Sequence, residues 1–194
     1  AFPLKKITEL GHSNGSIVGF DLAHGAGNIQ PNLHNTGADF AVWCTYKYLN
    51  SGPGGVSGFY INEKHVSNPE ILRFAGWWGH DKSDRFEMPD KFKPIPTAES
   101  WQLSNAPVLS MAAHLASLDI FEKTGMQALR EKSEKLTSFQ EFIINDVNSK
   151  TGENLEIITP EDSKDRGCQL SIIAHGYGKK LFDEISDKGV VADW

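Results

Sequence analysis

The chain has 194 residues, of which 39% are hydrophobic and 23% are charged, and its formal net charge is −6. These values are ordinary for a soluble globular protein of one or two domains. The negative charge argues against nucleic acid or an anionic membrane as a partner. No apolar run approaches the roughly 18 residues of a membrane span. The cysteines, Cys44 and Cys168, are far apart and match no metal spacing, which favours the cytoplasm over an oxidising compartment.

The chain starts with Ala1 and runs directly into a helical pattern, without an initiator methionine. We therefore expect a fragment of a longer protein, in which case a missing targeting signal says little. Residues 3–11 predict the end of a helix that stops at Gly11, and Asn14 with Gly15 predicts a turn.

Three short apolar runs follow, at residues 16–21, 38–44 and 56–61. Continuous apolar runs of this length indicate buried strands in a sheet that helices cover on both faces. Residues 64–105 show no periodicity, and so long an irregular stretch is typical of a binding loop or a subunit contact.

Helical spacing returns after Pro107, in two successive segments that reach residue 147. Residues 155–159 and 168–174 then predict strands, residues 179–187 predict a helix that stops at Gly189, and Val190 with Val191 predicts the start of another strand. The expected fold class is α/β. Residues 1–105 form part of a large domain, and residues 106–194 form a small C-terminal α+β domain, with the boundary near 105–125.

The most informative pair of residues is Asp21 and Lys47, because each follows a predicted strand at its carboxyl end, where open α/β sheets bind ligands. Pyridoxal phosphate chemistry needs a lysine amine to hold the cofactor and a carboxylate to keep the ring nitrogen protonated. The spacing alone is a weak signal, since an aspartate at a strand end usually caps a turn and an isolated lysine usually reaches solvent. Asp21, His24 and His34 match no standard zinc arrangement, so we expect no metal site.

Longer stretches of sequence strengthen this interpretation. The segments Gly19–His24, Trp43–Asn50, Gly76–His80 and Ser104–Pro107 occur in that order. Together they resemble kynureninase, a pyridoxal phosphate enzyme of the aspartate aminotransferase fold, and the similarity runs over nearly the whole chain. The resemblance implies that residues 1–105 are part of the cofactor-binding large domain of a transferase-like fold.

The resemblance also implies a role for individual residues. Lys47 matches the lysine that forms the Schiff base and moves the α-proton, and Tyr46 matches a tyrosine that binds the cofactor phosphate and assists proton transfer. Asp21 matches the partner of the ring nitrogen, and His24 matches a neighbouring cofactor contact. The remaining matches are Trp77 and Asn105, as phosphate contacts from a second subunit, and His80 and Ser104, as residues that line the substrate pocket.

Simpler structural roles are also open for these residues. His24 could cap the turn at Gly25, and Trp77 could be a core residue beneath a loop. Asn105 or Ser104 could cap the helix that follows Pro107, and a helix cap is compatible with phosphate binding. The glycine-rich segment 52–55 lacks the spacing of a phosphate-binding loop, and we expect a tight turn there that lets the backbone approach the cofactor.

The function that the resemblance implies is hydrolysis of L-kynurenine or 3-hydroxykynurenine to anthranilate or 3-hydroxyanthranilate plus L-alanine. The enzyme would be a cytoplasmic homodimer in tryptophan catabolism and NAD biosynthesis. The chain by itself is expected to be inactive, because the parts that stack on the ring and grip the substrate carboxylate are not in it. Two alternatives stay open: another pyridoxal phosphate enzyme of the same fold, such as a cysteine desulfurase or an aminotransferase, and a non-catalytic dimerisation fragment.

Overall fold

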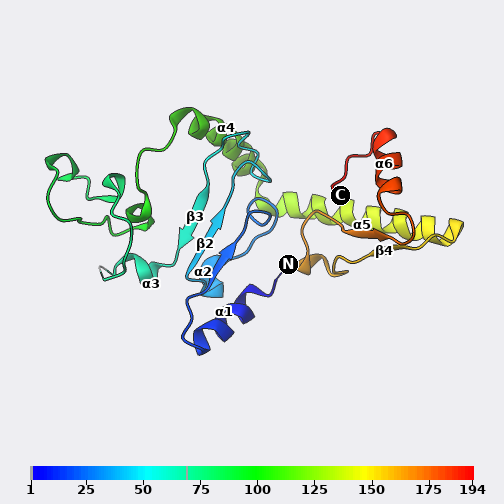
Figure 1. The fold of residues 1–194 in the computed structure, drawn as a ribbon, viewed down its shortest axis with the longest axis horizontal. Helices are drawn as coiled ribbons and strands as arrows, with labels where there is room; N and C mark the ends of the chain where they lie inside the picture. The colour runs from blue at the N-terminus through cyan, green and yellow to red at the C-terminus, as the bar shows by residue number, and fades with distance from the viewer. Residues whose placement is uncertain (1, 69) are drawn as a thin grey trace. The chain divides into compact units, whose positions relative to one another are not determined.

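A computed structural model describes residues 2–68 and 70–194, which form two compact units, residues 2–126 and 127–194. Figure 1 shows the helices and strands of the two units. The predicted domain boundary near 105–125 lies just before this division, and the assignment of residues 1–105 and 106–194 to two domains stays a prediction. Within the described residues, no helix is both long and apolar enough to cross a membrane.

The first unit begins with helix α1, Leu4–Ser13, which ends two residues later than the sequence indicates. Gly11 does not stop the helix. A Cβ atom at this position would lie 2.3 Å from Cγ2 of Val18, so the glycine allows the chain after the turn to fold back against the helix. The predicted turn is present, with Gly15 at φ 74°.

A three-stranded sheet follows, made of β1 (Gly19–Asp21), β2 (Phe40–Trp43) and β3 (Gly58–Ile61), in the order β1-β2-β3. The short helix α2, Leu33–Thr36, lies in the connection from β1 to β2. β1 and β2 are parallel, with Asp21 aligned with Val42, whereas β3 is antiparallel to β2, with Trp43 aligned with Gly58. Each of the three predicted runs therefore forms a strand, and the carboxyl ends of β1 and β2 lie at the same edge of the sheet.

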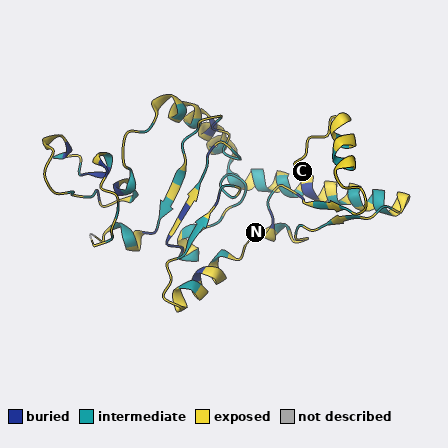
Figure 2. Cartoon of the chain, in the orientation of Figure 1, coloured by how far each residue is buried: buried dark blue, intermediate teal, exposed yellow. Residues whose placement is uncertain are grey.

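The two faces of the sheet differ in burial (Figure 2). Ala41 is completely buried, whereas the side chains that alternate with it point to the other face and stay partly exposed, as Phe40 (40%), Val42 (45%) and Phe59 (40%) show. Within the described residues of the first unit, helices therefore do not cover both faces of the sheet, contrary to the expectation from the continuous apolar runs.

A buried carboxylate joins several elements at the opposite edge of the sheet, where β2 begins. Asp39 is 3% exposed and accepts hydrogen bonds from the backbone N–H of Val18 (2.6 Å) and from Lys64 Nζ (2.5 Å). The Nε2 atoms of His12 and His65 lie 2.8 and 2.7 Å from its two oxygens. Burial alone would raise the pKa of Asp39, but these hydrogen bonds, led by that of Lys64, lower the pKa well below its usual range.

In the described part of 63–107, residues 63–68 and 70–107, the helices are all short, as the lack of periodicity indicates. They are α3 (Glu63–Val66), η1 (Trp77–Gly79), η2 (Arg85–Glu87) and η3 (Ala98–Trp101). Helix α4, Val108–Thr124, then begins directly after Pro107, as predicted. Most of its large apolar side chains are exposed, including Leu109 at 87% and Leu115 at 61%.

The second unit packs a long helix against a two-stranded sheet (Figure 1). Helix α5, Met126–Thr151, precedes the antiparallel strands β4 (Leu155–Ile157) and β5 (Ile172–Ala174), and a short turn η4 (Ser163–Asp165) lies between them. Helix α6 spans Lys179–Asp187, with the residue bounds that the sequence predicts. Val190 and Val191 form no strand: the N–H of Val190 bonds back to the carbonyl of Ile185, and Val191 is 98% exposed.

One ion pair links α5 to the segment after η4. The side chain of Arg166 is 2% exposed, and its guanidinium donates to both carboxylate oxygens of Glu141, with Nη2 2.9 Å from Oε2. Nη1 also donates to the carbonyl of Pro160 at 3.1 Å. The hydrogen bond from Arg166 lowers the pKa of Glu141 and keeps this carboxylate charged.

Candidate functional site

Asp21 is the last residue of β1, and its side chain is exposed at the carboxyl edge of the sheet. Oδ1 accepts a hydrogen bond from the N–H of Ala23 at 2.8 Å, so the carboxylate caps the turn that follows the strand. Within the described chain, no hydrogen bond engages Oδ2. Asp21 can therefore cap the turn and still offer one oxygen to a protonated ring nitrogen.

Lys47 lies in the connection from β2 to β3, residues 44–57, which we call the lysine loop. The lysine is half-buried, and its amine forms no ion pair with any described residue. The N–H of Asn50 donates to the carbonyl of Lys47 at 3.0 Å, which forms a tight turn with Asn50 in the left-handed region at φ 54°. The lysine therefore stands on a defined turn.

The loops after β1 and β2 touch each other. The ring of His24 meets the ring of Tyr48 edge-on, with 6.1 Å between the centroids. Gly27, at φ 81°, lies so close to the lysine loop that a Cβ atom there would be 3.0 Å from the carbonyl carbon of Tyr48. The segment that carries Asp21 and the segment that carries Lys47 are thus in direct contact. The turn at Gly25 is closed by its own N–H bonding to the carbonyl of Leu22, so His24 is not needed to cap it.

Tyr46 precedes the lysine and is 55% exposed. A hydrogen bond with Cys44 is the main factor that raises the pKa of the Tyr46 hydroxyl. The thiol of Cys44 is also 3.8 Å from the carbonyl of Ala23, in the loop after β1. Tyrosine is protonated at neutral pH and the raised pKa keeps it so, which leaves the Tyr46 hydroxyl able to donate a hydrogen bond.

Trp77 and His80 belong to a separate loop that Arg85 holds together. Arg85 donates through Nη2 to the carbonyls of Trp78 (2.9 Å) and His80 (3.0 Å), and its guanidinium lies 4.7 Å from the Trp78 ring centroid. Trp77 is 44% exposed, so it is not a core residue, and its indole N–H donates to the carbonyl of Arg85 at 3.2 Å.

The ring of His80 is 5% exposed and is bonded at both nitrogens. The N–H of Lys93 donates to Nδ1 at 3.2 Å, and Nε2 is 3.1 Å from Oδ1 of Asp84. Both contacts lie inside the loop, so the ring here acts as a fixed support. Its predicted contact with substrate stays a prediction.

Ser104 and Asn105 are both exposed, just before α4. Pro107 occupies the cap position of that helix, and no side chain caps its N-terminus. The alternative that Asn105 or Ser104 serves as the helix cap is therefore wrong. Both side chains are available for contacts outside the unit, and their predicted roles in phosphate and substrate binding stay predictions.

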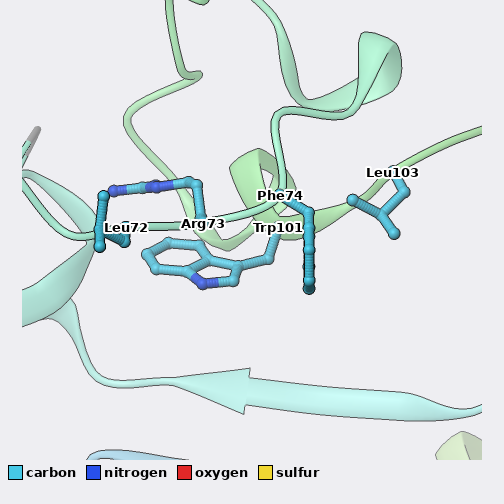
Figure 3. Close-up of a pocket in the computed structure, with 5 residues that line it drawn as sticks. All are labelled: Leu72, Arg73, Phe74, Trp101 and Leu103. Carbon is cyan, nitrogen blue, oxygen red and sulfur yellow. The ribbon is translucent and has the colours of Figure 1, made fainter.

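A pocket of about 420 Å³ lies among residues 72–103 and was not predicted from the sequence (Figure 3). It is lined by Leu72, Arg73, Phe74, Trp101 and Leu103. The Arg73 guanidinium stacks 4.0 Å from the Trp101 ring centroid and donates to Ser100 Oγ at 2.6 Å. The contacts that form the pocket join residues about 30 positions apart, and no short motif records such a pairing.

The residues at the carboxyl edge fit the cofactor that the sequence resemblance implies. Asp21 offers an unshared carboxylate oxygen, Lys47 offers an amine without an ion-pair partner, and the missing side chain at Gly27 lets the two loops approach. A planar pyridine ring with an aldehyde requires this donor set.

Comparison with known proteins identifies the relatives of the chain. Residues 129–194 match the family model of the kynureninase C-terminal domain. The kynureninase of Christiangramia forsetii is 50% identical over 193 residues, and that of Myxococcus xanthus is 48% identical over 194 residues. Each alignment covers 100% of this chain and 45% of the relative. The chain therefore spans a little under half the length of the curated relatives it matches.

The fold is shared with solved structures whose sequences are more distant. The cysteine desulfurase CsdA of Escherichia coli superposes with a TM-score of 0.70 at 17% identity, over 97% of this chain and 44% of that one. An alanine–glyoxylate aminotransferase from Nostoc superposes with a TM-score of 0.64 at 18% identity, over 96% of this chain and 46% of that one. These likenesses confirm the predicted aminotransferase-type α/β fold. The sequence identities above show that this chain is similar to kynureninases over its whole length, and residues 129–194 are similar to the C-terminal domain of that family.

Proposed function

We propose that these residues, within a protein of kynureninase length, serve a pyridoxal phosphate-dependent hydrolase that cleaves L-kynurenine or 3-hydroxykynurenine beside the γ-carbonyl. The products are anthranilate or 3-hydroxyanthranilate and L-alanine. The observation that carries the proposal is the contact between the loops after β1 and β2, through His24 and Tyr48, because it brings the segments of Asp21 and Lys47 to one place. The 50% identity to kynureninases over the whole chain favours this reaction over others on the same fold.

The roles of the two central residues follow from their surroundings. The Lys47 amine would hold the cofactor aldehyde, because it lies on a tight turn and forms no ion pair with any described residue. Asp21 uses its unshared oxygen to hold the pyridine nitrogen protonated. When bound, pyridoxal phosphate supplies the electron sink that stabilises negative charge on the substrate carbon. His24 supports the same ring from the loop after β1.

Two residues of the lysine loop move protons. Lys47 would take the α-proton of the bound amino acid and return it in a later step. Tyr46, whose hydroxyl is protonated at neutral pH, would give a proton to the departing alanyl carbon. Water adds to the γ-carbonyl, the bond between the β and γ carbons breaks, and the acyl half leaves as the anthranilate carboxylate. The proton that water loses balances the proton that the β carbon gains from Tyr46.

The second group of residues completes the site in a homodimer. Trp77 and Asn105 are both exposed, and we propose that they reach the cofactor phosphate of a second subunit. His80 and Ser104 are proposed to line the substrate pocket, His80 through the shape of the loop it supports. The enzyme is further proposed to be cytoplasmic and to work in tryptophan catabolism and NAD biosynthesis.

A labelling experiment tests the cofactor assignment directly. In a protein of kynureninase length that carries these residues, pyridoxal phosphate is added, reduced with borohydride and located by peptide mapping. Label on Lys47 is expected, with loss of label in Lys47→Arg and no loss in Lys91→Arg, a matched change at an exposed lysine of the same unit. Label distributed over surface lysines would refute the assignment.

Product analysis separates the proposed reaction from its alternatives. Kynurenine should yield anthranilate, detected by its fluorescence, and alanine. A cysteine desulfurase or an aminotransferase would not release these two products from kynurenine. The 194-residue chain alone should give no turnover, because it carries only part of the site. Robust turnover by the isolated chain would contradict that proposal, and a stable dimer without label on Lys47 would favour the dimerisation alternative.

A further inference from the structure

The lysine loop contains a pair of hydroxyl groups that the proposed chemistry does not use. Thr45 is 1% exposed and Ser51 is 4% exposed, and their Oγ atoms are 2.8 Å apart. The N–H of Ser51 also donates to the carbonyl of Thr45 at 3.1 Å. Residues 45 and 51 are thus joined by a backbone bond and a side-chain bond, which close a ring of chain around Lys47.

The closure is tied to the returning chain. Thr45 Oγ1 donates to the carbonyl of Val56, at the start of the path to β3, so its proton is committed there and Ser51 donates to Thr45. Gly55 packs against this pair: a Cβ atom there would lie 1.9 Å from Ser51 Oγ. The hydroxyl pair therefore sits in a space that admits no larger side chain.

The segment inside the ring is held from outside as well. Ser117 of α4 donates through Oγ to the carbonyl of Leu49 at 2.6 Å. The turn at Lys47 is therefore fixed at its base by Thr45 and Ser51 and at its tip by Ser117. A buried hydroxyl pair in a loop otherwise rich in exposed groups restricts the conformations that the lysine backbone can adopt.

We infer that Thr45 and Ser51 are positioning residues, which close the loop so that the Lys47 amine is presented in one orientation. Neither hydroxyl touches the reacting atoms in this arrangement, since both are buried beneath the turn. The effect on Lys47 rests on the proposed function, whereas the closure itself does not. The two parts can therefore be tested separately.

Hydrogen exchange tests the closure without any cofactor. In the 194-residue chain, Thr45→Val and Ser51→Ala should each speed exchange of the backbone amide of residue 51 by about tenfold. The reason is that each variant loses the buried hydrogen bond between the two side chains. Thr45→Ser keeps the hydroxyl and should restore the slow rate. Ser57→Ala, an exposed serine at the end of the same loop, is the matched control and should leave exchange unchanged. If Thr45→Val unfolds the chain, Ser51→Ala decides the result.

Cofactor trapping then tests the positioning role. In the kynureninase-length protein, Thr45→Val and Ser51→Ala should weaken borohydride-trapped binding of pyridoxal phosphate at Lys47 by about tenfold and shift its pH profile, and Thr45→Ser should restore both. Unchanged exchange of the Ser51 amide in both variants would overturn the closure. Faster exchange with unchanged trapping would overturn the positioning role. Faster exchange with no trapping at Lys47 in the unaltered protein would refute the proposed function and leave the closure supported.

Discussion

Replacing Asp39 should strongly destabilise the first unit. The carboxylate is 3% exposed and is the common acceptor for His12, Lys64, His65 and the backbone N–H of Val18. These partners come from α1, from the chain entering β1 and from α3. The loss of one carboxylate would therefore release three segments from the amino edge of the sheet.

The loss in the free energy of unfolding depends on how well water can hydrogen-bond to the partners of Asp39 once the carboxylate is gone. A hydrogen bond to a charged group contributes about 1.5–3 kcal/mol, and breaking a buried ion pair costs about 3–5 kcal/mol. The Lys64 and His12 side chains are 44% and 35% exposed, so water can solvate them after the change. We therefore expect Asp39→Ala to cost about 3 kcal/mol, and Asp39→Asn, which keeps one acceptor oxygen, to cost about 2 kcal/mol.

Tryptophan fluorescence during urea unfolding measures this cost, because four of the five tryptophans lie in residues 2–126. The matched control is Glu9→Gln, which removes an exposed ion pair from α1 with 3.9 Å between the Lys5 and Glu9 charges and should change stability by less than about 0.5 kcal/mol. Equal stability of Asp39→Ala and Glu9→Gln would refute the idea that the buried carboxylate joins these elements.

Two further changes should give clear results. The pKa of Asp39 is lowered in the folded chain, so its contribution is complete above the unfolded value of about 3.9 and is lost as the pH falls toward the lower folded value. The stability difference between the unaltered chain and Asp39→Asn should therefore shrink between about pH 5 and pH 2, and a difference that stays constant over that range would contradict this. In the second unit, Arg166→Met should destabilise the chain by about 2–3 kcal/mol by leaving Glu141 unpaired. Combining it with Glu141→Gln should recover part of the loss in thermal unfolding, and purely additive losses would argue against the pairing.

Local patterns in the sequence predicted the longer helices, α1, α4, α5 and α6, and none of the short ones. Helix α6 spans the residues indicated by its spacing, and α4 starts where Pro107 places it, because helical periodicity and proline act within a few residues. Gly11 was misinterpreted for the opposite reason. Its small size serves a contact with Val18, seven residues later, and a glycine that permits packing looks the same in sequence as a glycine that ends a helix.

The candidate site was predicted mainly from the resemblance of four sequence segments to kynureninase. The position of Asp21 and Lys47 after predicted strands contributed only part of the prediction. The capping role expected of an aspartate at a strand end is present in Asp21, and it leaves one oxygen for other contacts. The pairing of Thr45 with Ser51 could not be predicted, because both residues are common in exposed loops and only the folded turn buries their hydroxyls. Likewise, the pocket at Arg73 and Trp101 depends on a contact between distant segments.

The lysine loop connects two neighbouring antiparallel strands. Its two ends lie side by side, because Trp43 of β2 is aligned with Gly58 of β3. The strand register fixes both ends of the lysine loop, whatever the sequence of the loop itself. Mutations within the lysine loop can therefore alter the surroundings of Lys47 without shifting β2 and β3. Mutations in the strands can alter the sheet without changing the residues of the loop. This architecture lets one scaffold be inherited while its chemistry diverges.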